Sequence, residues 1–249
     1  MLGLILVEAQ LDPTLVIGGI VNKFNTNAIS GSGDIIVVEA DEFDRTFLSL
    51  KPTISIINNL DLEHLDCYSN INDLQKAFTQ FANSVPFYGL ISLCIDSKNV
   101  RNIINNIKRP YITFGTNKRA SIRAEKIKHN GVGSTFELYK DNTFIDSINL
   151  NMPGKHNILN ALGAISIALE LNVDIENIKK ALKTYSGVRR RFELKYTTLK
   201  KVYIVDDYAH HPTEISSVLN SVKQVSNKRK IMEWSKRYPS YNYFYKDKH

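Results

Sequence analysis

Carboxylates cluster at the end of an apolar run in the first fifth of the chain. Residues 35–39 read as a buried strand, and Glu39, Asp41 and Asp44 stand at its end. Open α/β sheets bind ligands at the carboxyl ends of their strands, and carboxylate oxygens are ligands that Mg²⁺ prefers. This segment therefore predicts a magnesium site, with a solvated acidic loop as the alternative.

A second polar strand end lies nearby in the sequence. The apolar residues 53–57 lead into a loop that carries Asp61, Glu63 and His64. An imidazole beside further carboxylates offers a second set of metal ligands, although a single loop histidine is usually solvated. The prediction of a metal centre therefore depends on the two clusters together.

Two asparagines begin a predicted helix in the segment PGKHNILNA, residues 153–161. Either His156 or Asn157 is expected to start the helix, and Asn160 lies one turn later on the same face. Carboxamides both donate and accept hydrogen bonds, so they suit the edge of a nucleotide base. Helix capping by Asn157 is the alternative.

Basic and imidazole side chains gather around a predicted domain junction. Arg191 closes the run of residues 189–191, from which an arginine can reach a phosphate, although a solvated basic hinge fits equally well. Asp207 and His210 follow the next predicted strand, and capping and packing is the alternative for the histidine.

The sequence contains no phosphate-binding loop. Gly31 and Gly33 precede a strand instead of following one, which favours a turn over a dinucleotide fingerprint. The pair Gly154-Lys155 is followed by His156 where a P-loop needs Ser or Thr. The backbone donors and lysine that normally hold nucleotide phosphates are therefore missing.

Hydrophobic periodicity predicts an α/β fold for the elements that position these residues. A strand over 14–17, broken at Gly18-Gly19, is followed by the strands already described and by alternating helices and strands. Three segments with period-two alternation form a small antiparallel meander. The other predicted elements are helices 2–10, 74–85, 100–107, 157–171, 175–185 and 212–222, strands 90–95, 111–114 and 201–205, and meander strands 121–128, 134–139 and 143–150.

Composition limits the class of protein. The 249 residues are 43% hydrophobic and 23% charged, which is typical of globular domains. The net charge of +7 lies mostly in residues 225–249, which carry +5. No apolar run approaches the roughly 18 residues of a membrane span, and Cys67 and Cys94 form no C-x-x-C pair. We therefore expect a cytoplasmic protein with no membrane segment, disulfide framework or zinc ribbon.

Six longer motifs between Leu11 and Glu214 together resemble the Mur ligases of peptidoglycan synthesis, and among them the alanine-adding branch. They read LDPTLVIGG, VVEADEFDRTFLSLKP, NLDLEHLD, NMPGKHNILNALGA, GVRRRFE and VDDYAHHPTE. The resemblance implies a mostly parallel, ATPase-type central sheet followed by the start of a second, Rossmann-like domain. It also implies ATP-dependent joining of L-alanine to UDP-N-acetylmuramate through an acyl phosphate, with Mg²⁺ required.

The same resemblance assigns a role to each candidate residue. Glu39 and His64 match ligands of two magnesium ions, Asn157 and Asn160 match contacts to adenine, Arg191 matches a hinge arginine near the phosphates, Asp207 matches a ribose ligand, and His210 matches a residue that faces the reacting centre. The implied domains are a central ATP-binding domain over 1–192, an incomplete C-terminal domain over 193–230 and a divergent basic and aromatic tail over 231–249.

The family's phosphate loop and UDP-binding domain would precede residues 2–10. We therefore expect a ligase fragment with little or no activity alone, which an amino-terminal Mur chain as partner would restore. Three alternatives remain: a muropeptide-recycling ligase, a non-catalytic partner of an intact ligase, and a single-stranded nucleic-acid binder that uses the basic and aromatic tail. Charge runs are usually solvated, which argues against nucleic acid as a partner.

Overall fold

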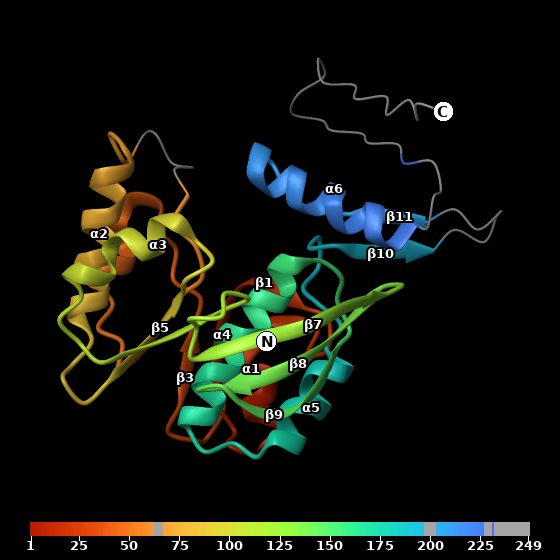
Figure 1. Ribbon diagram of the computed structural model, residues 1–249, viewed down its shortest axis with the longest axis horizontal. Helices are drawn as coiled ribbons and strands as arrows, with labels where there is room; N and C mark the ends of the chain where they lie inside the picture. The colour runs from red at the N-terminus through yellow and green to blue at the C-terminus, as the bar shows by residue number, and fades with distance from the viewer. Residues whose placement is uncertain (62–66, 197–202, 227–230, 232–249) are drawn as a thin grey trace.

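A six-stranded sheet forms the centre of the computed structural model, which describes residues 1–61, 67–196, 203–226 and 231 (Figure 1). The strands lie side by side in sequence order. The first four run parallel and the last two turn back as an antiparallel meander. The strands are β4 (Ile54–Ile57), β5 (Leu90–Cys94), β6 (Tyr111–Gly115), β7 (Ile122–Asn130), β8 (Gly133–Lys140) and β9 (Thr143–Leu150). The α/β prediction is confirmed, and the meander belongs to the main sheet.

Helices cover both faces of this sheet. Helix α4 (Lys155–Glu170) packs across β4 to β7 on one face. On the other face lie α2 (Ile71–Ser84), α3 (Lys98–Ile103) and the short 3-10 helix η2 (Ile104–Asn106), seen at the left of Figure 1. Strand β5 shows why both faces are covered, since Ile91 and Leu93 join the α2 side of the core while Cys94 joins the α4 side.

Two further helices pack against α4. Helix α1 (Leu2–Glu8) packs against α4 and against α5 (Ile175–Thr184), and α5 in turn packs on β9. Asp174 caps α5, because its side chain accepts a hydrogen bond from the backbone N–H of Glu176. Helix α4 begins at Lys155 after Gly154, so the expectation that His156 or Asn157 starts it is wrong.

A separate three-stranded sheet carries the acidic motif. Strand β1 (Thr14–Val21) lies between β2 (Thr26–Ile29) and β3 (Ile36–Val38), antiparallel to the first and parallel to the second. The predicted break at Gly18-Gly19 is wrong. The strand continues through both glycines and absorbs them as an irregularity in its register with β2, as strand glycines often do.

Strand β3 is not the buried strand that its sequence predicts. Ile36 is 66% exposed and Val38 is 45% exposed, and Val16 of the neighbouring strand, in register with Val38, is 47% exposed. Only one face of this small sheet is packed, through Leu15 and Val37 on the core. The three exposed side chains Val16, Ile36 and Val38 are called the open face below.

The carboxy-terminal elements lie together at the upper right of Figure 1. Strand β10 (Glu193–Tyr196) pairs antiparallel with β11 (Tyr203–Asp206), and α6 (Pro212–Ser226) follows. Strand β10 has no counterpart among the predicted elements. Helix α6 packs against β7, and Val218, Val222 and Val225 touch the main core. A 3-10 helix, η1 (Phe43–Ser49), connects the acidic motif to β4.

Candidate functional site

Glu39 lies directly after β3, on the exposed end of that strand. Its Oε2 accepts a hydrogen bond of 2.8 Å from the backbone N–H of Gly18 in β1. Burial raises the pKa of Tyr185 to about 12, and the negative charge of Glu39 adds to this increase. The acidic motif thus acts electrostatically on the segment that follows α5.

Asp41 and Asp44 shape the loop after Glu39. Asp41 Oδ1 accepts a hydrogen bond of 2.9 Å from the backbone N–H of Phe43, which forms a tight Asx turn. Asp44 and Arg45 both have left-handed backbones, with φ of 55° and 58°. Strained backbone of this kind is typical of functional loops. Arg45 holds the loop, because its Nη2 lies 2.6 Å from Asp73 Oδ2.

The donor set fits a magnesium ion that is bound mainly by its nucleotide. Within the described ranges no three His, Cys, Asp or Glu side chains gather into a metal-binding group. Mg²⁺ usually takes one or two carboxylates and completes its shell with phosphate oxygens and water. Glu39, solvent-accessible and held by a backbone donor, offers one such ligand. His64 lies outside the described residues.

The two asparagines of α4 have different surroundings. Asn157 is buried, and its Nδ2 donates a hydrogen bond of 2.8 Å to the carbonyl of Pro153. Asn160 is exposed. Asn157 therefore does not cap the helix as an acceptor but joins its first turn to the preceding loop, whereas Asn160 is open to a ligand.

Arg191 and His210 are connected through a glutamate. Arg191 Nη1 lies 3.2 Å from Glu214 Oε1, and the other carboxylate oxygen accepts a hydrogen bond of 3.1 Å from the backbone N–H of His210. Burial alone would raise the pKa of Glu214, but these two donors together bring it below its ordinary value. Glu214 therefore stays ionised at neutral pH and holds the arginine and the histidine loop together.

Asp207 uses both carboxylate oxygens on backbone donors. Oδ2 accepts a hydrogen bond of 2.7 Å from Phe192 N–H, and Oδ1 accepts one of 2.7 Å from Ala209 N–H. The aspartate thereby ties the hinge before β10 to the loop after β11. Its remaining lone pairs can accept hydrogen bonds from a ligand.

His156 connects the start of α4 with this hinge. Burial lowers the pKa of His156, while the charges of Asp207 and Arg191 act on it in opposite directions. The hinge also lies along β1, where Val188 bridges Val21 and Arg189 N–H donates to the Ile20 carbonyl at 2.8 Å. The structure thus places Asn157, Arg191 and Asp207 around one junction, and Glu39 is hydrogen-bonded to β1, the strand that borders it.

Sequence reasoning missed Gly18, Tyr185 and Glu214. A glutamate in the first turn of a predicted helix is a usable signal for Glu214, because such a side chain can accept a hydrogen bond from a backbone N–H that precedes the helix. The contact of Gly18 with Glu39 joins two strands 21 residues apart, and no local pattern predicts it.

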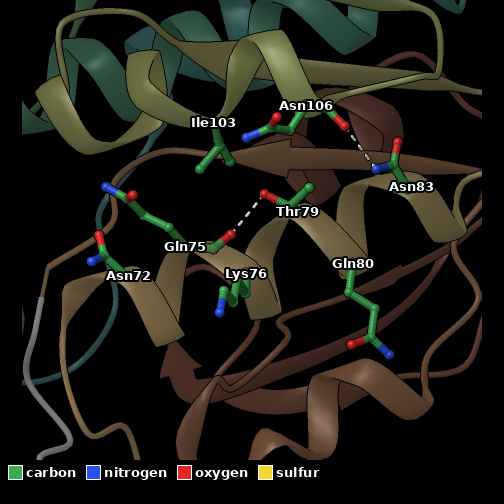
Figure 2. A pocket seen from close by; sticks show the side chains of 8 residues that line it. All are labelled: Asn72, Gln75, Lys76, Thr79, Gln80, Asn83, Ile103 and Asn106. Carbon is green, nitrogen blue, oxygen red and sulfur yellow. Dashed lines mark hydrogen bonds between the residues drawn. The ribbon is translucent and has the colours of Figure 1, made fainter.

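A well-defined cavity lies elsewhere. It has a volume of about 620 Å³ and runs between α2 and the α3–η2 segment, where carboxamide side chains dominate its lining (Figure 2). Asn83 closes one end, since its Nδ2 donates a hydrogen bond of 3.0 Å to the Asn106 carbonyl. None of the predicted site residues that the structure describes lines this cavity.

The two cysteines of the chain are not paired with each other. Cys67 and Cys94 are free thiols, and burial raises the pKa of Cys94. Across the part of the chain that the structure describes, no helix is both long enough and apolar enough to span a membrane.

Comparison with known families matches two consecutive segments. Residues 21–168 match the Mur ligase middle domain, and residues 190–233 match the Mur ligase glutamate ligase domain.

Three individual proteins that the chain resembles are alanine ligases by name. The chain is 41% identical over 232 residues to UDP-N-acetylmuramate--L-alanine ligase of Salinibacter ruber, covering 93% of this chain and 49% of the relative. It is 44% identical over 250 residues to that of Persephonella marina, covering 98% and 53%. The UDP-N-acetylmuramate-alanine ligase structure from Thermotoga maritima superposes with a TM-score of 0.79 at 27% identity, covering 92% and 51%. The chain thus spans about half the length of the curated relatives it matches.

Proposed function

The chain belongs to the Mur ligase family, and from this premise we propose that it supplies the ATP-binding part of a cytoplasmic ligase that joins L-alanine to UDP-N-acetylmuramate. The observation that carries the proposal is the identity of 41–44% to alanine ligases over more than nine tenths of the chain. The candidate residues support it, because segments far apart in sequence meet at the junction of α4, the hinge and β1.

In this proposal the γ-phosphoryl group of ATP is transferred to the carboxylate of the muramyl substrate with release of ADP. The amine of alanine then displaces phosphate and loses a proton to form the amide. Magnesium, when bound, would neutralise charge between the nucleotide phosphates and the incoming carboxylate. Glu39 and His64 would hold the metal ions. Asn160 would read the adenine edge, and Asn157 would fix the helix turn that presents it.

The hinge residues have the remaining roles. Asp207 would bind the ribose, and Arg191 would contact phosphate from a position that Glu214 fixes. His210 would face the reacting centre, with its backbone held by the same glutamate. The arrangement binds and orients substrates but contains no phosphate-binding loop, so the isolated chain is expected to bind magnesium and ATP weakly and to have little ligase activity.

Nucleotide binding is the first test. Calorimetric titration with ATP, with and without Mg²⁺, would compare the wild-type chain with Glu39→Gln and His64→Ala. Asp34→Asn is the matched control, because Asp34 is an exposed acid at the opposite end of β3. Magnesium-dependent binding that Glu39→Gln and His64→Ala remove, and Asp34→Asn retains, supports the proposal. Absence of binding by the folded wild-type chain overturns it.

Complementation tests the reaction itself. The amino-terminal half of the Salinibacter ruber ligase, which would supply a UDP-binding domain and phosphate loop, would be mixed with this chain and assayed for phosphate release with UDP-N-acetylmuramate. Release that depends on L-alanine supports the alanine-adding activity. Release with a muropeptide in place of alanine would identify a recycling ligase instead.

A further inference from the structure

Asp96 is a charged side chain that the proposed function leaves without a role. It lies just after β5, and its carboxylate is largely buried, with 10% of the side chain exposed. Oδ1 accepts hydrogen bonds from the backbone N–H groups of Thr116 at 2.8 Å and Asn117 at 3.2 Å. Oδ2 accepts one of 2.6 Å from the Thr116 hydroxyl and lies 2.9 Å from Lys155 Nζ. Four donors from two distant segments therefore converge on one carboxylate.

The turn after β6 is built around this carboxylate. Gly115 has φ of 157°, and a Cβ placed on it would lie 2.2 Å from Asp96 Oδ1. Any side chain at position 115 would therefore displace the aspartate. A glycine that makes room for a carboxylate, followed by two backbone N–H groups that bind it, forms one local unit with a defined geometry.

The first residue of helix α4 contacts this unit. Its N-cap is Gly154, which provides no side-chain hydrogen bond to the first turn. Lys155 opens the helix, and its ion pair with Asp96 joins that opening to the turn after β6. Asn157 and Asn160, the two adenine candidates, follow within the next five residues.

We propose that Asp96 is a positioning residue for nucleotide-base recognition, which fixes the 115–117 turn and the first turn of α4 against each other so that Asn160 meets the base in one geometry. The proposal rests on the proposed function, in which α4 reads adenine. It adds a residue that touches no ligand and acts through Lys155 and the turn.

The charge of Asp96 is maintained at neutral pH. Burial alone would raise its pKa, but the Thr116 hydroxyl, the Lys155 ammonium and the backbone donors outweigh burial and hold the pKa below its ordinary value. An ionised acceptor binds such donors about twice as strongly as a neutral one. Asp96→Asn removes the charge and retains the shape of the side chain, so it is the informative substitution.

The test compares Asp96→Asn with Asp146→Asn. Asp146 pairs with Lys179 at 2.9 Å on β9 and α5, so it is a second Asp–Lys pair of equal length away from α4. Amide hydrogen exchange would be followed residue by residue, and affinities for ATP and GTP would be measured by NMR titration with Mg²⁺ present. We expect Asp96→Asn to accelerate exchange at 116–117 and 158–160, and to weaken ATP binding about 10-fold while changing GTP binding less than 2-fold.

The ratio of the two affinities separates positioning from a general loss of structure, because partial unfolding weakens ATP and GTP binding equally. Lys155→Met is the second variant, since it removes only the connection to α4 and is expected to weaken ATP binding about 3-fold. Equal ATP-to-GTP ratios in wild type and a folded Asp96→Asn, or unchanged exchange in both segments, overturn the proposal. If the wild-type chain binds no nucleotide, the proposed function fails, and exchange alone then decides whether Asp96 positions α4.

Discussion

The carboxylate of Glu39 is held by the backbone of Gly18, with 2.8 Å between Oε2 and the amide nitrogen. Glu39 follows β3 and Gly18 lies within the neighbouring strand β1, so the glycine pair in β1 and the acidic motif after β3 are joined by this hydrogen bond. A backbone donor fixes the orientation of the carboxylate while the other oxygen remains available to a cation.

Substitution of Gly18 by alanine is expected to disturb the site without disturbing the fold. A Cβ there would lie 3.4 Å from Glu39 Cδ and Oε2, which is ordinary van der Waals contact, so the fold is not disturbed but the methyl group limits how the exposed carboxylate can reorient toward a cation. We expect magnesium-dependent ATP affinity to fall about 10-fold, since small misplacements of a ligand are costly. Calorimetric titration and thermal unfolding measure the two effects.

Gly19→Ala is the matched control in the same strand. Its Cβ would lie 2.5 Å from Val188 Cγ1, inside the packing between β1 and the hinge. Overpacking of this kind costs about 1–3 kcal/mol of folding free energy. A Gly18→Ala protein that loses stability to the same extent as Gly19→Ala would contradict the distinction between the two positions.

The two asparagines of α4 are expected to have different roles, Asn157 in the stability of the fold and Asn160 in ligand binding. Asn157→Ala leaves the carbonyl of Pro153 without its donor in a buried setting, so we expect a loss of about 1–3 kcal/mol in unfolding free energy. Asn160→Ala removes an exposed side chain, with a change within about 0.5 kcal/mol. Denaturant titrations would measure both values.

ATP affinity completes the comparison. We expect Asn160→Ala to weaken ATP binding about 3- to 10-fold, the effect of one neutral hydrogen bond. ATP affinity that does not change in Asn160→Ala would remove Asn160 from the proposed adenine contacts, and a fully stable Asn157→Ala would remove the structural role of Asn157.

Some strands of the fold could be predicted from the sequence, and others could not. The meander β7–β9 followed directly from alternating side chains and turn residues, which are local signals. Strand β10 was missed, because the four residues Glu193–Tyr196 are too short and too charged to stand out. The apolar run of β3 resembles a strand covered on both faces, but coverage depends on distant segments that the run itself does not encode.

The site shows the same division. The positions of Glu39, Arg191, Asp207 and His210 at strand ends and at the junction were predictable from the order of elements. The hydrogen bonds that hold them, from Gly18, Phe192 and Glu214, come from other segments and were not. The roles of these residues toward a nucleotide remain predictions.

His156 is expected to make stability depend on pH. Burial lowers its pKa in the folded chain, so below the unfolded value of about 6.5 the unfolded state binds more protons than the folded state. Unfolding free energy should therefore fall as pH decreases from 7 toward 5, by up to about 1.4 kcal/mol per pH unit from this group.

His156→Gln tests this pH dependence. We expect its unfolding free energy to vary less between pH 7 and 5 than that of the wild type, as measured by urea titration at each pH. The carboxylates with lowered pKa values, Asp96 and Glu214 among them, lose their contribution only at more acidic pH, so they do not obscure this window. Parallel curves for the two proteins would show that the imidazole is not protected from protonation in the folded state.

The open face of Val16, Ile36 and Val38 is expected to make the isolated chain self-associate. These side chains are 47%, 66% and 45% exposed on neighbouring strands, and β3 is the edge of its sheet. Exposed apolar edge strands promote association between chains.

The double variant Ile36→Thr and Val38→Thr should remain monomeric at concentrations at which the wild-type chain scatters light. Its melting temperature should be unchanged, because neither side chain is packed in the core. Val37→Thr, on the packed face of the same strand, should instead lower the melting temperature and leave association as it is. A wild-type chain that stays monomeric over the same concentrations would show that the open face does not drive association.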